Sequence, residues 1–103
     1  FYCDQANTNQ VLNMFENIGE QFDLIIDDGL HTPHGATSFF KDSYPFLNEG
    51  GLYIIEDLNM VNHGDEYKNL MLEISKKYNP PFIDILKLEH TNGKDNNLMI
   101  VLK

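Results

Sequence analysis

Two kinds of apolar pattern alternate along this sequence. Short apolar runs bounded by polar and turn residues are typical of buried strands, whereas apolar residues recurring every three or four positions are typical of helices. The predicted strands cover residues 22–27, 52–56, 83–89 and 98–102, and residues 1–3 read as the end of a further strand. The predicted helices cover residues 8–18, a segment beginning at Thr32-Pro33, and residues 66–78.

Capping and breaking residues set the predicted ends of the first two helices. Thr8 is expected to cap the first helix, and Gly19 is expected to end it. Thr32 followed by Pro33 is a cap with proline at the first helical position, which predicts the start of the second helix. Pro45 must bend or restart that helix because proline cannot donate the helical hydrogen bond.

Strands that alternate with helices predict a mostly parallel sheet with right-handed crossovers. Residues 83–89 and 98–102 flank Asn92-Gly93, which is typical of a hairpin turn, so the last strand should run antiparallel to its neighbour. Residues 98–102 are apolar on both faces and should lie inside the sheet beside 52–56. Residues 83–89 carry charges and should form the edge.

Composition limits the classes of function. The chain has 103 residues, 42% of them hydrophobic, which suffices for one core and therefore one domain. No apolar run approaches the roughly 20 residues of a membrane helix, so we expect no membrane partner. Only 7 residues are Lys or Arg against 16 acidic ones, so we expect no nucleic acid partner. The net charge of −9 suits either a bound cation or simple solubility. Cys3 is the single cysteine, which fits a reducing cytoplasm.

Two predicted strands end in acidic residues. Asp27 and Asp28 lie at the end of the run LIIDDG, and Glu56 and Asp57 lie at the end of the run LYIIED. Ligands of open parallel sheets bind beyond the carboxyl ends of the strands, and successive parallel strands are often neighbours about 4.8 Å apart. Carboxylates at both ends would then share one small volume, where a cation or a proton must relieve their repulsion. The set Asp28, Glu56 and Asp57 offers only oxygen ligands, which suit Mg²⁺ or Mn²⁺ rather than zinc.

His31 follows Asp28 by three residues, on the turn before the second helix. An imidazole has an unperturbed pKa of about 6.5 and can accept a proton near neutral pH. Three interpretations of His31 stay open: a general base, a direct metal ligand, or a polar residue at a helix entry. For Asp27, a structural role is equally open, because an aspartate after a strand often accepts hydrogen bonds from backbone amides of the turn.

Three segments together resemble the class I S-adenosylmethionine-dependent methyltransferases. They are DQAN near the start, FDLIIDDGLHTPH, and FFKDSYPFLNEGGLYIIEDL, in the family's order and spacing over residues 1–58. Within that family the similarity is greatest to the metal-dependent O-methyltransferases of macrolide and related sugars. The resemblance implies a Rossmann-like α/β fold whose sheet is mostly parallel with an antiparallel last strand. Because the family's glycine-rich G-x-G loop is missing, the N-terminal part of the fold is expected upstream, and residues 1–103 would be the C-terminal half of one methyltransferase domain.

The resemblance also assigns roles to individual residues. Asp28, Glu56 and Asp57 would hold Mg²⁺, with Mn²⁺ as an alternative, and His31 would be the catalytic general base. Asp4 and Gln5 would contact the adenine of S-adenosylmethionine, and Asp27 would approach its methionine end.

The implied reaction is methyl transfer from S-adenosylmethionine to a hydroxyl of a small molecule, a sugar or glycoside. Two alternatives remain: a non-catalytic remnant of the fold that acts as a binding or assembly module, and an unrelated metal-dependent hydrolase. We expect the 103 residues alone to be inactive and not to bind S-adenosylmethionine. Self-association into a homo-oligomer is left open.

Overall fold

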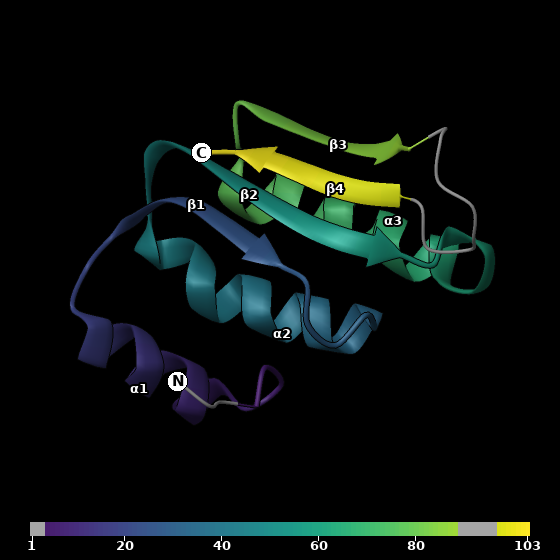
Figure 1. The fold of residues 1–103 in the computed structure, drawn as a ribbon. Helices are drawn as coiled ribbons and strands as arrows, with labels where there is room; N and C mark the ends of the chain where they lie inside the picture. The colour runs from purple at the N-terminus through teal and green to yellow at the C-terminus, as the bar shows by residue number, and fades with distance from the viewer. Residues whose placement is uncertain (1–3, 89–96) are drawn as a thin grey trace.

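A four-stranded sheet with three α-helices makes up the computed structural model, which describes residues 4–88 and 97–103 (Figure 1). The strands are β1 (Phe22–Asp27), β2 (Leu47–Leu58), β3 (Phe82–Lys87) and β4 (Asn97–Leu102). The helices are α1 (Thr8–Ile18), α2 (Pro33–Ser43) and α3 (Met60–Tyr78), and a 3₁₀ turn, η1 (Tyr44–Phe46), joins α2 to β2.

The strand order is β1-β2-β4-β3. β1 and β2 are parallel, and β4 is antiparallel to both β2 and β3. Three strands therefore run in one direction and the last runs against them, as the sequence predicted, with β4 inserted beside β2 and β3 at the edge. The predicted hairpin turn at Asn92-Gly93, the end of the third strand at Glu89 and the strand end at residues 1–3 lie outside the described residues.

Several predicted boundaries were wrong. The cap of α1 is Asn7, whose side chain accepts a hydrogen bond from the Gln10 amide, and not Thr8. Strand β2 begins at Leu47 rather than at residue 52, because Gly50 takes a left-handed φ of 81° and lets pairing continue through the expected turn. Helix α3 begins at Met60 rather than at residue 66, with non-helical dihedrals at His63.

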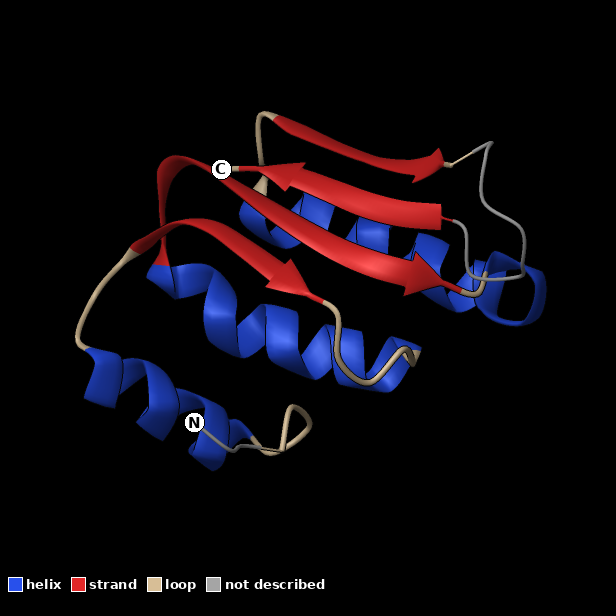
Figure 2. Cartoon of the chain, in the orientation of Figure 1, coloured by secondary structure: helices blue, strands red, loops and turns tan. Residues whose placement is uncertain are grey.

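All three helices lie on one side of the sheet (Figure 2). Alternate strand residues point toward them, since successive side chains of a strand face opposite sides. Tyr53 and Ile55 of β2, and Met99 and Val101 of β4, are buried beneath the helices together with Phe40 of α2. Within the described ranges, none of these helices combines the length and the apolar character that a bilayer crossing requires.

The other face of the sheet is apolar and exposed. Cross-strand pairing aligns one row of apolar residues on it, Leu24, Leu52, Leu102 and Phe82. Ile26 lies in the next row on β1, and the side chains of Leu24 and Ile26 are 50% and 47% exposed. No helix of the described residues covers this face (Figure 2), so the sheet has one packed side and one open side.

Candidate functional site

The carboxyl ends of β1 and β2 meet at the same end of the sheet. The two strands are parallel, and Asp27, the last residue of β1, pairs with Ile55 of β2. The residues that follow these positions therefore emerge side by side. In this way the topology brings Asp28 and Asp57 together, as expected for the ends of neighbouring parallel strands.

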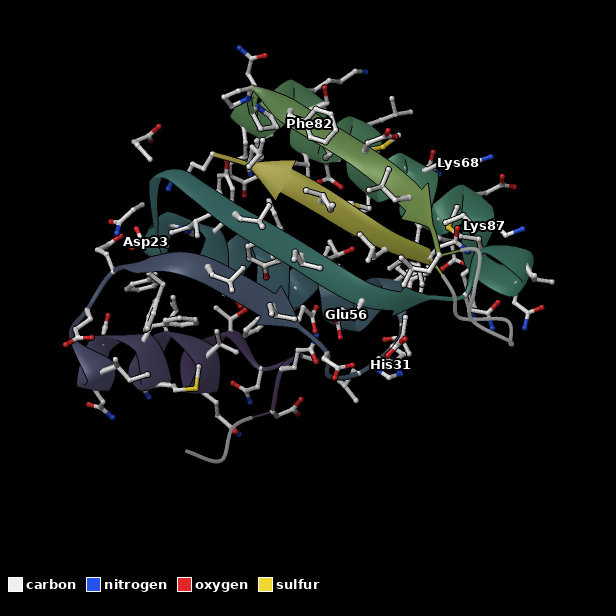
Figure 3. All side chains as sticks on the ribbon, turned by 45° about the horizontal axis from the view of Figure 1, so that its top comes forward. Asp23, His31, Glu56, Lys68, Phe82 and Lys87 are labelled. Atoms are coloured by element: carbon white, nitrogen blue, oxygen red, sulfur yellow. The ribbon has the colours of Figure 1, made fainter. Side chains whose placement is uncertain are left out.

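Asp28, His31 and Asp57 form one cluster at this end of the sheet; Figure 3 labels His31 there. The Nε2 atom of His31 lies 3.1 Å from Oδ1 of Asp28 and 3.4 Å from Oδ2 of Asp57. One potential ligand atom from each residue lies within 4.8 Å of the other two. The three side chains are between 42% and 59% exposed, so an ion or a small molecule can reach them.

Local backbone features position each member of this cluster. His31 directly precedes Thr32, which caps α2 by accepting a hydrogen bond from the Gly35 amide at 3.1 Å. Asp57 has a φ of 56°, in the left-handed region that non-glycine residues rarely adopt. The pairing of β2 with β4 is irregular between Ile55 and Leu58, so Asp57 lies at a break in the regular alternation. Unusual backbone of this kind is often found at functional sites.

Glu56 lies outside the cluster. Strand alternation places Glu56 on the same face as Ile54, the open face of the sheet (Figure 3). Within the described residues, no oxygen of Glu56 belongs to the group that Asp28, His31 and Asp57 form. The role of Glu56 as a metal ligand therefore stays a prediction.

Asp27 is turned inward and its side chain is only 5% exposed. Its carboxylate accepts hydrogen bonds from Nε2 of Gln5, at 2.8 and 2.9 Å, and from the Gly29 amide at 3.2 Å. Burial raises the pKa of the Asp27 carboxyl above its usual range, and the hydrogen bonds from Gly29 and Gln5 oppose that rise. The backbone contact to Gly29 is the structural role that the sequence left open for Asp27.

Two of the three residues expected to contact the cofactor, Gln5 and Asp27, lie in contact with each other. Gln5, Asp27 and Asp28 line an open hollow of about 290 Å³ beside the cluster. Asp4 is not among its lining residues, and its Oδ1 accepts a hydrogen bond from the Ala6 amide at 3.0 Å. The contact between Gln5 and Asp27 was missed at the sequence level. The one available signal was Gly29 after two aspartates, since glycine permits close approach of another group.

Comparisons with known proteins bear on the identity of this site. No protein-family model matches the sequence. The chain is 38% identical over 56 residues to an 8-demethyl-8-α-L-rhamnosyl tetracenomycin-C 2'-O-methyltransferase of Streptomyces olivaceus, covering 54% of the chain. It is 46% identical over 37 residues, 36% of the chain, to the demethylmacrocin O-methyltransferase of Streptomyces fradiae.

Among solved structures, the fold matches MycE, a methyltransferase from the mycinamycin biosynthetic pathway, in complex with Mg, SAH and mycinamycin VI. The TM-score is 0.70 at 18% identity, over 98% of this chain and 30% of MycE. The expected α/β fold of the class I methyltransferases is thereby confirmed, as is the resemblance to macrolide and sugar O-methyltransferases. The chain spans only 15% and 9% of the two Streptomyces relatives.

Proposed function

We propose that this chain, whose homologues are sugar O-methyltransferases, carries the metal-binding and proton-accepting residues of an S-adenosylmethionine-dependent O-methyltransferase. The acceptor would be a hydroxyl of a small glycoside. The observation that carries the proposal is the cluster of Asp28, His31 and Asp57 at the ends of two neighbouring parallel strands.

Asp28 and Asp57 would hold a divalent cation, with Glu56 as a further ligand. Two exposed carboxylates whose oxygens lie this close together fit Mg²⁺, and also Mn²⁺, because both ions prefer oxygen ligands. The related MycE structure contains Mg. A divalent cation supplies positive charge that favours ionisation of a nearby hydroxyl.

His31 would act as the general base. The carboxylates of Asp28 and Asp57 flank its Nε2 and hold the imidazole at the strand ends. A neutral imidazole there could accept the proton of the sugar hydroxyl. S-adenosylmethionine, when bound, would supply the methyl group to that oxygen, and its methyl carbon–sulfur bond would break to leave S-adenosylhomocysteine. Holding acceptor and methyl group in line is expected to supply much of the rate.

The hollow lined by Gln5, Asp27 and Asp28 is the place where we expect the methionine end of S-adenosylmethionine. It adjoins the cluster through Asp28, so a cofactor there would lie beside the proposed base. Asp4 stays a candidate for the adenine contact from the exposed loop before α1. The tetracenomycin relative is named for a rhamnosyl substrate, which supports a glycoside as the acceptor.

Methyl transfer by the full-length protein to a panel of glycosides tests the proposal. We expect His31→Ala to lower the rate by about 10²–10⁴-fold, the usual contribution of a general base. His34→Ala is the matched control, because His34 is an exposed histidine in the first turn of α2, and its rate should equal that of the wild type.

A measurement of Mn²⁺ binding to His31→Ala separates the two chemical roles of this histidine. If His31 is the base, the variant loses activity and keeps the wild-type Mn²⁺ affinity. If Mn²⁺ binding is lost as well, His31 is a ligand and the assignment of the base is wrong. Undiminished methyl transfer by His31→Ala would refute both roles.

A further inference from the structure

We propose that Gln5 is a positioning residue for the metal site: its side-chain amide fixes the loop that carries Asp28 and His31. The inference rests on the proposed function, because it assumes that Asp28 and Asp57 bind a divalent cation. It gives Gln5 a role different from the adenine contact that the resemblance implied.

Both ends of the Gln5 amide are used within the chain. Its Nε2 donates to the two carboxylate oxygens of Asp27 at 2.8 and 2.9 Å. Its Oε1 accepts a hydrogen bond from the Leu30 amide at 2.6 Å. The Gln5 side chain therefore holds both Asp27, which precedes Asp28, and Leu30, which precedes His31.

Gly29 shows that this arrangement requires close packing. A Cβ atom at position 29 would lie 2.0 Å from Oε1 of Gln5 and 3.0 Å from its Cδ, far inside van der Waals contact. Gly29 is not among the glycines with positive φ in the described residues, so its backbone does not itself demand glycine. The space that the missing side chain leaves is occupied by the amide of Gln5.

The bracing by Gln5 bears on metal binding because it ties the loop to another part of the chain, in addition to the 3.4 Å contact of His31 with Asp57. Asp27 also accepts from the Gly29 amide, and the His31 amide donates to the Gly29 carbonyl at 3.0 Å; both contacts are internal to the loop. Gln5 links the loop to a segment 22 to 25 residues away in the sequence. Without that link, Asp28 and His31 would have to be ordered when the cation binds, which lowers its affinity.

The test measures Mn²⁺ binding to the full-length protein from the electron paramagnetic resonance signal of the free ion. Gln5→Met keeps the length of the side chain and removes its hydrogen bonds, and Asn9→Ala, on the exposed surface of α1, is the control. We expect Gln5→Met to weaken Mn²⁺ binding about tenfold, at the low end of the range for residues that support metal ligands. Asn9→Ala should bind as the wild type does.

A rescue experiment distinguishes positioning from general damage to the fold. Gln5→Glu places a carboxylate against Asp27 and should weaken Mn²⁺ binding. The double variant Gln5→Glu with Asp27→Asn exchanges donor and acceptor across the same contact and should recover most of the affinity. If the double variant binds no better than Gln5→Glu, the positioning role is refuted.

Asp28→Asn separates failure of this inference from failure of the proposed function. If Asp28→Asn leaves Mn²⁺ binding unchanged, the metal site itself is refuted. If Asp28→Asn abolishes binding while Gln5→Met matches Asn9→Ala, the metal site stands and Gln5 has no positioning role.

Discussion

Replacing Gly29 by alanine should destabilise the protein through Gln5 rather than through the backbone of residue 29. The new Cβ would lie 2.0 Å from Oε1 of Gln5, so the amide must leave its place. The displaced contacts are a bond to a carboxylate, worth about 1.5–3 kcal/mol, and a bond to the Leu30 amide, worth about 1 kcal/mol. Water can replace the lost hydrogen bond to the exposed Leu30 amide, so we expect the free energy of unfolding to fall by about 2 kcal/mol in total.

Denaturant unfolding of a double-mutant cycle tests this reasoning. Gln5→Ala alone should cost about the same 2 kcal/mol, and the double variant Gly29→Ala with Gln5→Ala should cost no more than either single change. Gly64→Ala is the matched control: its Cβ would meet only Cε of Met60, at 3.8 Å, and alanine in a helix should stabilise by up to about 1 kcal/mol. If the double variant costs the sum of the two single variants, the proposed clash is wrong.

Three further predictions concern the fold. Asp42 of α2 is 4% exposed, and its Oδ2 has no hydrogen-bond partner among the described residues. Asp42→Asn should therefore raise the free energy of unfolding by about 1 kcal/mol, and a lower melting temperature of the variant would contradict this. Burial raises the pKa of Tyr53 above the ordinary tyrosine value of 10.0, so the unfolded chain loses this proton first and the free energy of unfolding falls as the pH rises above 10. Denaturant titrations should show a smaller fall for Tyr53→Phe, and an equal fall would refute the assignment. Leu24→Lys on the open sheet face should lower the fluorescence of the hydrophobic dye anilinonaphthalene sulfonate bound to the 103-residue chain, while the far-ultraviolet circular dichroism stays unchanged. Equal fluorescence would show that the dye binds elsewhere.

Some strands of the sheet could be predicted from the pattern of apolar residues in the sequence. The segment 22–27 became β1 with the predicted bounds, because its three consecutive apolar residues, 24–26, are followed closely by Asp28 and Gly29, which are typical of turns. The interior place of β4 followed from residues that are apolar on both faces. The start of β2 was missed because Gly50-Gly51 is typical of a turn, although here glycine accommodates an irregularity inside a strand.

The start of α3 was missed for a related reason. Residues 60–65 lack an apolar period of three or four, so no pattern indicated helix there. The helix begins because the side chain of Asn59 accepts a hydrogen bond from the Asn62 amide at 3.0 Å. Asparagine is common at helix caps and in loops alike, so it could not decide between the two.

Only the part of the candidate site that follows from the sheet topology could be predicted from the sequence. Two parallel neighbours that both end in acidic residues place Asp28 near Asp57, and His31 follows on the turn. Strand alternation places Glu56 on the open face, but the direction of the Asp57 side chain could not be predicted, because it depends on the strand irregularity and the left-handed backbone at Asp57. The contact of Gln5 with Asp27 joins residues 22 apart in the sequence and depends on how the loop before α1 packs against the end of β1.

The central claim is that the ends of β1 and β2 form a divalent metal site. Anomalous diffraction from a crystal of the full-length protein grown with Mn²⁺ tests it most directly. We predict an anomalous peak within about 2–2.5 Å of carboxylate oxygens of Asp28 and Asp57. A Mn²⁺ peak elsewhere, with these two carboxylates free of metal, would contradict the claim.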